Sequence, residues 1–398
     1  MDEYFKMNDG ETITEYCHRI AVLRETYDWT WHQVAKICNE ELNIDLSAEA
    51  YRSKERKYKK DKINEVMCDS PQEEQSETDS IKEVILDMKK ERVKLSDERT
   101  QNNAIIRRIS REETIKEIAK DIVDKFDFEL KLPTYEKISY EKGNEEAILL
   151  LSDWHYGIEI DNYWNKYNPD IAKERLTKLR DEVVSILTAN NIGLLHVINL
   201  GDLISGRIHN TIRINNRIDV ITQTIEVSEL LSEFLNSLSE YVHIEYHDTA
   251  DNHSRIEPNL KDSLDLESLT RITGEFLKLR LKDNKNIEIF DNVFGDDIAT
   301  FNVCGHKCVG VHGNKDKTKT IIDKLTMLTK QDYQLVVSAH LHHFNADEQN
   351  ETIRISNGSL MGTDDFAVNL RLNSKPSQTL IISDNYNVVR CIFKLDLE

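Results

Sequence analysis

The residues best suited to chemistry are acidic side chains and histidines that directly follow short apolar runs. One apolar run of five residues continues into Ser-Asp-Trp-His, so that Asp153 and His155 stand two positions apart. On extended backbone this spacing directs both side chains to the same side, where a carboxylate and an imidazole can bind one cation. A later run continues into Ser-Ala-His-Leu-His, in which His340 and His342 repeat the spacing with two imidazoles.

Three further polar clusters follow apolar runs of the same kind. They are Gly201-Asp202 after residues 194–200, Asp251-Asn252-His253 after residues 242–246, and His312 after residues 308–311. Glycine before an aspartate permits a sharp turn that exposes the carboxylate at the tip of a strand. In open α/β sheets, functional groups gather beyond the carboxyl ends of the strands, and all five clusters stand at such expected ends.

In chain order the five clusters read D-x-H, G-D, N-H, H and H-x-H. This series resembles the calcineurin-like metallophosphoesterase superfamily, and the resemblance covers residues 145–398. Each short motif alone is common, but five in this order, each after an expected strand, form a specific pattern. The resemblance implies an α/β fold class: a layered β-sandwich flanked by helices, here preceded by a small all-α domain and a helical connector.

The resemblance also implies roles for individual residues. Asp153, His155 and His342 would bind one divalent metal, Asn252, His312 and His340 the other, and Asp202 would bridge the two. His253 would be catalytic, stabilising the phosphate or protonating the leaving oxygen while a metal-bridging hydroxide attacks phosphorus. Mixed nitrogen and oxygen ligands suit manganese foremost, with iron, zinc, cobalt or nickel as alternatives.

Two departures from the family pattern concern the third cluster. The family usually has Gly-Asn-His followed by an acid, whereas this chain has Asp251 in place of the glycine and Ser254 in place of the acid. Because that acid normally orients the catalytic imidazole, its loss affects the tuning of His253. Asp251 could supply the hydrogen bond from another direction or could approach a metal, and the sequence leaves both open.

The segment at residues 205–217 is rich in side chains that can contact phosphate. The planar fork of arginine matches phosphate oxygens, so Arg207 and His209 are candidate substrate-binding residues. The alternative is a solvated basic loop. A structural role is expected instead for histidines without a partner at a suitable spacing, namely His18, His32, His196, His243, His247 and His306.

Residues 1–62 predict a compact helical domain. Thr12-x-x-Glu15 and Thr30-x-x-Gln33 are capping boxes that begin the first two helices, and Ser47 can cap a third. The third helix is locally basic, and its candidate nucleic-acid-binding residues are Arg52, Lys54, Arg56 and Lys57. A three-helix unit of this kind resembles a helix-turn-helix domain. The alternatives are a solvated basic face and a protein-docking unit.

Between these regions the sequence predicts a linker and a connector. Residues 63–79 lack apolar periodicity and are rich in serine, glutamate and glutamine, which indicates a flexible acidic linker. Residues 80–144 predict a helical connector, with helices beginning near Ser80 and Ser110. Their narrow apolar stripes allow either a coiled-coil homodimer through residues 80–126 or packing against the next domain.

Composition restricts the class of protein. The chain has 398 residues, and its 52 basic against 72 acidic side chains give a formal net charge of −20, so any nucleic-acid contact must be local. Six scattered cysteines without a C-x-x-C pair are typical of a reducing compartment, which predicts a cytoplasmic location. The sequence shows neither a secretion signal nor an apolar run long enough to span a membrane.

We therefore expect a two-metal phosphoesterase, and foremost a phosphodiesterase or nuclease that acts on DNA. A helix-turn-helix-like unit joined to such a domain also looks like proteins of phage or prophage origin. Two alternatives remain at this stage. One is a phosphomonoesterase or cyclic-nucleotide phosphodiesterase acting on a nucleotide or a phosphoprotein, and the other is a metal-stabilised DNA-binding regulator with little activity.

Overall fold

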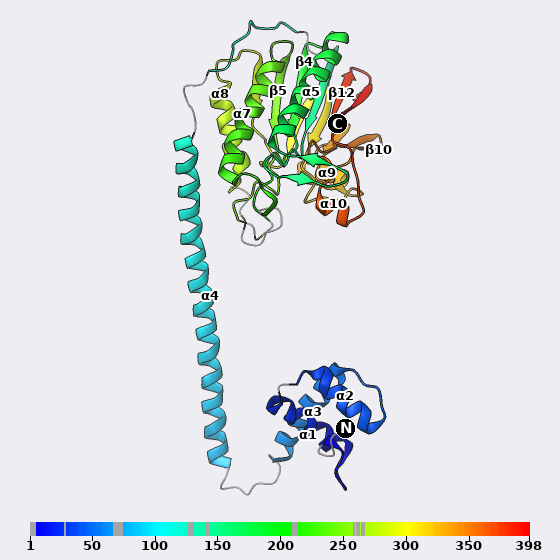
Figure 1. Ribbon diagram of the computed structural model, residues 1–398. Coiled ribbons are helices and arrows are strands. Elements are labelled where there is room, and N and C mark those ends of the chain that lie inside the picture. Colours follow the sequence, from blue (N-terminus) through cyan, green and yellow to red (C-terminus); the bar gives the residue numbers. More distant parts are fainter. Residues whose placement is uncertain are drawn as a thin grey trace. The chain divides into compact units, whose positions relative to one another are not determined.

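The computed structural model describes residues 5–27, 29–66, 75–125, 131–140, 144–208, 214–257, 259, 263 and 267–398. The chain divides into two compact units, Met1–Ile106 and Arg107–Glu398 (Figure 1). Each unit has a hydrophobic core of its own. Among the described residues, no helix combines the length and the apolar character that a membrane crossing requires.

Three helices form the core of the first unit, as the sequence predicts. They are α1 (Ile13–Thr26), α2 (Trp31–Leu42) and α3 (Ala48–Val66). Both predicted capping boxes are present: the Thr12 hydroxyl accepts from the Glu15 backbone N–H, and Thr30 does the same for Gln33. Tyr16, Ile20, Val34, Cys38 and Tyr51 are buried where the three helices meet.

Helix α4 (Gln75–Lys125) is longer and more continuous than expected. The sequence suggested separate starts at Ser80 and Ser110, but residues 75–125 contain neither glycine nor proline, so nothing in the backbone interrupts the helix. The ends of the expected linker at residues 63–79 are also helical, in α3 and α4, and residues 67–74 lie outside the described residues. A homodimer through residues 80–126 stays a prediction.

The second unit contains two sheets. The six-stranded sheet has the order β13-β12-β1-β4-β5-β6, and the five-stranded sheet has the order β10-β11-β9-β8-β7. Their strands are β1 (Glu145–Leu151), β4 (Leu194–Asn199), β5 (His243–Asp248), β6 (Ile287–Phe290), β7 (Ala299–Val303), β8 (His306–Gly310), β9 (Leu335–Ser338), β10 (Asn345–Gln349), β11 (Thr352–Ser356), β12 (Ser377–Asp384) and β13 (Cys391–Asp396). A short hairpin pairs β2 (Ile160–Asp161) with β3 (Lys166–Tyr167).

Helices cover the outer faces of the two sheets (Figure 1). They are α5 (Pro169–Ala189), α7 (Val220–Leu238), α8 (Leu269–Arg280) and α9 (Ile321–Thr329). The short α10 (Asp365–Asn369) has no buried residue. Alternation along β1 shows the layering, because Leu149 and Leu151 pack in the core beside α5 and α7 while Ile148 and Leu150 pack between the sheets. The predicted layered sandwich flanked by helices, preceded by a helical region, is confirmed.

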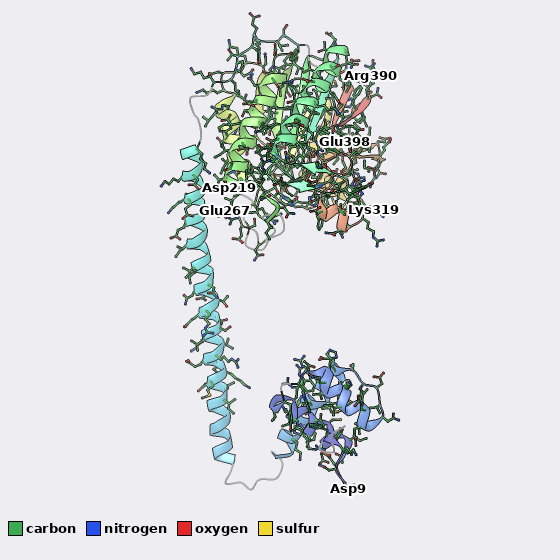
Figure 2. The ribbon with its side chains drawn as sticks, viewed as in Figure 1. Asp9, Asp219, Glu267, Lys319, Arg390 and Glu398 are labelled. Atoms are coloured by element: carbon green, nitrogen blue, oxygen red, sulfur yellow. The ribbon has the colours of Figure 1, made fainter. Side chains whose placement is uncertain are left out.

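Neighbouring strands in each sheet are parallel: β1, β4, β5 and β6 in one sheet, and β8, β9 and β11 in the other. Parallel strands present their carboxyl ends at one edge of a sheet, and side chains that follow them meet there. Helix α7 is fixed near this edge by Asp219, which Figure 2 labels and whose carboxylate accepts from the backbone N–H groups of Ile221 and Thr222.

The loops after β4 and β5 are packed tightly against each other at Gly206. This glycine has a φ of +70°, and a Cβ on it would lie 2.1 Å from the carbonyl oxygen of His253. The Gly206 backbone N–H donates to Gln223, and its carbonyl accepts from Asn216. The close approach therefore requires a residue without a side chain.

We expect Gly206→Ala to lower the free energy of unfolding by clearly more than Gly305→Ala, as measured by urea denaturation. Gly305 also has a positive φ, of +84°, but an added Cβ would meet no described atom within 4 Å. Its replacement should cost only the left-handed backbone strain of about 1–2 kcal/mol. Equal losses in the two variants would contradict the close packing of the two loops.

Candidate metal centre

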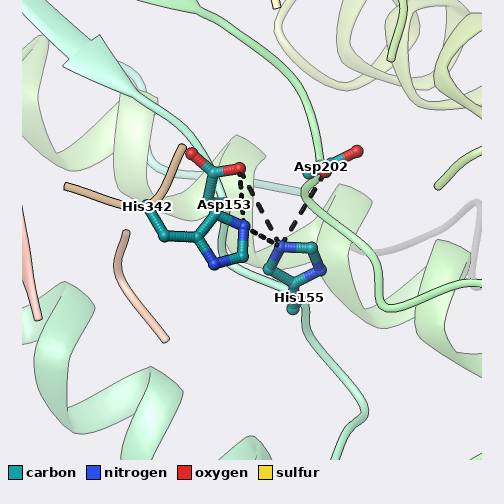
Figure 3. Close-up of side chains that lie close together, drawn as sticks. All are labelled: Asp153, His155, Asp202 and His342. Carbon is teal, nitrogen blue, oxygen red and sulfur yellow. Dashed lines mark hydrogen bonds and ion pairs between the residues drawn. The ribbon is translucent and has the colours of Figure 1, made fainter. Parts of the chain in front are cut away.

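The structure gathers the predicted ligands at the carboxyl ends of the parallel strands. Asp153 and His155 follow β1, Asp202 follows β4, His312 follows β8, and His340 and His342 follow β9. Asn252 and His253 lie in the loop after β5. Figure 3 shows Asp153, His155, Asp202 and His342 converging from three separate segments of the chain.

The backbone of these ligands differs from the extended form that the sequence suggested. Asp153, His155, Asp202, His340 and His342 all have positive φ values, between 44° and 68°. The alternating-strand explanation for D-x-H and H-x-H is therefore wrong, since the residues lie in tight left-handed turns beyond the strand ends. For residues other than glycine this conformation costs roughly 1–2 kcal/mol each, and such strain concentrates at functional sites.

The first group of ligands consists of Asp153, His155, His342 and Asp202, which offer ligand atoms within 4.8 Å of one another. The Nε2 atoms of His155 and His342 are 3.1 Å apart. Oδ1 of Asp153 lies 3.4 Å from Nε2 of His342 and 3.9 Å from Nε2 of His155. Imidazole nitrogens and carboxylate oxygens thus face a common point (Figure 3).

The second group shares Asp202 with the first and adds His312 and His340. Nε2 of His312 is 3.1 Å from Oδ2 of Asp202 and 3.1 Å from Nδ1 of His340. Asn252 also belongs here, because its Oδ1 is 2.9 Å from the same His312 nitrogen. The other ring nitrogen of His312 donates to the carbonyl of Leu200, which directs Nε2 toward the group.

The buried carboxylates fit metal ions. Both carboxylate oxygens of Asp153 and Oδ2 of Asp202 are buried, and they make no hydrogen bond to any residue in the described ranges. Burying such oxygens without hydrogen bonds is costly unless a cation compensates their charge. Buried aspartate and histidine side chains in two groups that share Asp202 can hold two metal ions, and nitrogen and oxygen donors together suit divalent transition metals.

The electrostatics of the centre favour a cation. Burial raises the pKa of Asp202, but His253 and His312 outweigh it and keep that pKa well below its usual value. Burial lowers the pKa of His312, yet Asp202 and Asp153 together raise it to about 10. The negative potential that holds a proton on His312 also attracts a metal ion, which would displace this proton on binding.

His253 lies beside Asp202 without belonging to either group. Its backbone N–H is 3.2 Å from Oδ1 of Asp202, and its Nε2 is 3.8 Å from Oδ2. Its Nδ1 donates to the carbonyl of Ser205 at 2.7 Å. A backbone carbonyl from the loop after β4 therefore orients this imidazole, in the place of the acid that the sequence lacks. Sequence reasoning missed Ser205, because any residue can offer a carbonyl.

Asp251 holds the loop rather than the His253 ring. Its carboxylate accepts from the backbone N–H and the hydroxyl of Ser254, at 2.7 and 3.0 Å, and from the hydroxyl of Thr270 at 3.1 Å. Neither alternative raised from the sequence describes this arrangement. Asp251 and Ser254 are partners of each other, and together they fix the turn that carries Asn252 and His253.

The structure gives less information about the other candidate residues. Arg207 is half-buried directly after Gly206, whose backbone lies against His253. His209 lies outside the described residues. The four basic candidates of the first unit are exposed on α3, and they are Arg52, Lys54, Arg56 and Lys57.

Comparison with known proteins gives distant similarity. No protein-family model matches the chain. A relative with 23% identity over 402 residues is the SPbeta prophage-derived uncharacterized protein YonJ of Bacillus subtilis (strain 168), and the alignment covers 96% of this chain and 95% of that protein.

Among solved structures, a novel archaeal phosphodiesterase is similar with 14% identity and a TM-score of 0.33, over 63% of this chain and 99% of that one. The zinc complex of Vps29 from Entamoeba histolytica is similar with 11% identity and a TM-score of 0.31, over the same shares. At these values neither likeness identifies an activity or a substrate.

We expect Asp202→Asn to lower the metal content of the purified protein to less than half of the wild-type value. The substitution removes the one carboxylate that both groups share. The residues around the two groups cannot replace its negative charge. Elemental analysis after dialysis measures the effect. Asp181→Asn, which removes an exposed acid on α5, is the matched control and should keep the full content. Unchanged metal content in Asp202→Asn would contradict the shared role.

Proposed function

We propose that this chain is a metal-dependent phosphoesterase that hydrolyses phosphodiester bonds in DNA, and that it belongs to the calcineurin-like metallophosphoesterases. The observation that carries the chemistry is the buried carboxylate of Asp202 between two groups of imidazole and carboxylate ligands. Two divalent cations bound there, manganese foremost, would polarise a phosphate group and activate water as the nucleophile. A prophage origin, by analogy with the B. subtilis relative, is part of the proposal.

The chain's own residues supply the proton transfer. Because a carbonyl can only accept, the bond to Ser205 places a proton on Nδ1 of His253 and leaves Nε2 as the ring nitrogen that can contact a substrate. Nε2 lies on the side of Asp202, and the His253 side chain is 13% exposed, so that a substrate can reach it. We assign to His253 the protonation of the leaving oxygen.

Backbone hydrogen bonds between the ligand turns contribute to positioning. The turns that carry Asp153, His155 and Asp202 are joined by backbone hydrogen bonds, since Asp153 N–H donates to the Gly201 carbonyl and His155 N–H donates to the Asp202 carbonyl. These bonds fix the two strand ends relative to each other. The ligands are therefore held in place before substrate binds, which favours the in-line geometry of phosphoryl transfer.

The choice of DNA as substrate rests on helix α3. Its exposed cations, Arg52, Lys54, Arg56 and Lys57, make the helix locally basic on a chain whose overall charge is strongly negative. Contacts from such cations to backbone phosphates give affinity without sequence specificity. The first unit would then bring the second unit to its substrate along a polynucleotide.

A compact nucleotide is the second candidate substrate. A cavity of about 310 Å³ adjoins His312 and is lined by residues that include Asn314, Lys315 and Lys324. Its volume lies at the lower end of the range for small-molecule sites. Lys315 is paired with Asp297 at 3.0 Å, so the lining combines both charges and does not form a uniformly basic groove.

We expect manganese-dependent cleavage of labelled single- or double-stranded DNA by the wild type, and no cleavage by Asp202→Asn. Bis-p-nitrophenyl phosphate should also be hydrolysed faster than p-nitrophenyl phosphate, because the proposed substrate is a diester. Preference for the monoester together with inactivity on DNA would favour the compact-nucleotide candidate. Inactivity of the wild type on every phosphoester would contradict the proposal.

We expect His253→Asn to lower kcat by roughly 10²–10⁴-fold, the usual contribution of a positioned acid or base. Metal content should stay at the wild-type value, since His253 belongs to neither ligand group. A substitution of Ser205 would not remove the hydrogen bond to His253, because the carbonyl that accepts it is part of the backbone. Metal loss in His253→Asn would show that the residue is a ligand.

We expect replacement of Arg52, Lys54, Arg56 and Lys57 by glutamine to weaken binding to long DNA and to leave hydrolysis of the small diester unchanged. The slope of log affinity against log salt should fall in magnitude by up to about 4 if all four contact phosphates. The matched control replaces four exposed cations of α4, namely Lys89, Lys90, Lys94 and Arg99. Equal effects of the two sets would remove the assignment to α3.

A further inference from the structure

A second group of metal-ligand residues is buried in the sandwich, away from the candidate metal centre. His196 of β4 and Glu245 and His247 of β5 offer ligand atoms within 4.8 Å of one another. All three are buried, with at most 7% exposure. His196 lies three residues before the end of β4, which at about 3.3 Å per residue is about 10 Å before the turn that carries Asp202.

Strand register brings the three residues together. β4 and β5 are parallel, with His196 paired to Glu245, and His247 follows Glu245 on the same face. That face points toward the second sheet, since the rings of His196 and His247 lie 6.2 and 5.6 Å from the ring of Phe301 in β7. The sequence shows only part of the group: Glu245 and His247 stand two positions apart on β5, whereas His196 comes from β4, which α7 separates from β5 along the chain.

The hydrogen bonds of His196 determine which of its ring nitrogens can bind a metal. Oε2 of Glu146 accepts from the backbone N–H of Cys304 at 2.9 Å and lies 3.0 Å from Nε2 of His196. A carboxylate that acts as an acceptor requires Nε2 to donate, so in the neutral imidazole Nδ1 carries the lone pair. Metal-binding histidines commonly have such a carboxylate on the opposite nitrogen.

The lone pair on Nδ1 faces a carboxylate. Nδ1 of His196 lies 3.3 Å from Oε2 of Glu245, and this buried nitrogen makes no hydrogen bond to any residue that the structure describes. Two electron-rich atoms this close repel each other unless a proton or a metal ion lies between or beside them. A separation of about 3.3 Å is also the distance between two ligands of a tetrahedral ion with bonds of about 2.0 Å.

His247 is suited to be the third ligand. Its ring stacks on Phe290 with centroids 5.0 Å apart, which fixes its plane. Its side chain is only 5% exposed, and such burial favours the neutral form of an imidazole. Neutral imidazole is the form that binds metals.

We propose that His196, Glu245 and His247 bind one Zn²⁺ ion inside the sandwich, with Glu146 positioning His196. Two imidazoles and one carboxylate are a ligand set that zinc commonly takes. The ion would link β4 to β5 on the face that packs against Phe301. This site is independent of the proposed function and of the candidate metal centre. The competing arrangement is a proton on His196 shared between two glutamates.

The test counts zinc in a background without the candidate metal centre. The double variant Asp153→Asn/Asp202→Asn removes both carboxylates of that centre, and after growth with zinc and dialysis we expect it to retain one zinc per chain by elemental analysis. Adding Glu245→Gln should remove that zinc. Adding His243→Gln should not, although it changes a buried histidine on the same face of β5. Glu146→Gln should weaken zinc binding by about 10–100-fold.

Two outcomes would overturn the proposal: a double variant that holds no zinc, or zinc retention after Glu245→Gln. If Glu245→Gln fails to fold, the double variant decides alone. After chelator treatment its thermal midpoint should rise when zinc is added, and added Co²⁺ should give the visible absorption of a tetrahedral ion with nitrogen and oxygen ligands. Absence of both responses would establish the protonated arrangement instead.

Discussion

The loops at the carboxyl ends of the parallel strands depend on the contacts of one buried group, the carboxylate of Asp202. It is fully buried and ionised, and its two oxygens contact groups from three loops: the backbone and ring of His253, Nε2 of His312 and Nε2 of His155. A buried charge of this kind is stable only when its neighbours compensate it. The loops after β1, β4, β5 and β8 therefore adopt conformations that deliver imidazoles to one point.

Sequence reasoning could predict which residues meet, but not how the backbone delivers them. Apolar runs mark strands, parallel strands end at one edge, and the polar residues after them converge, so Asp153, Asp202 and His312 could be found without a structure. The left-handed turns could not be predicted, because the residue types do not indicate them. Tertiary contacts impose the positive φ values on aspartate and histidine. The carbonyl of Ser205 was equally hidden, since backbone groups leave no mark in a sequence.

The buried histidines show the same limit in another form. His196 and His247 were expected to be structural because neither has a partner at a suitable spacing along the chain. Glu245, two positions before His247, is a partner that this expectation overlooked, and the register between β4 and β5, which no local pattern determines, adds His196. Helix α4 is the opposite case, because local helix propensity determines it. Without glycine or proline the helix continues past Ser80 and Ser110, the two residues at which the sequence suggested new helix starts.

The left-handed ligand turns have a consequence for how the chain can change over generations. Glycine at Asp153, His155, Asp202, His340 or His342 would relieve backbone strain of roughly 1 kcal/mol at each position. A descendant that no longer needed these side chains would thus gain stability by losing them, and random drift would run toward glycine. Five strained positions therefore carry side chains that the backbone conformation alone does not favour.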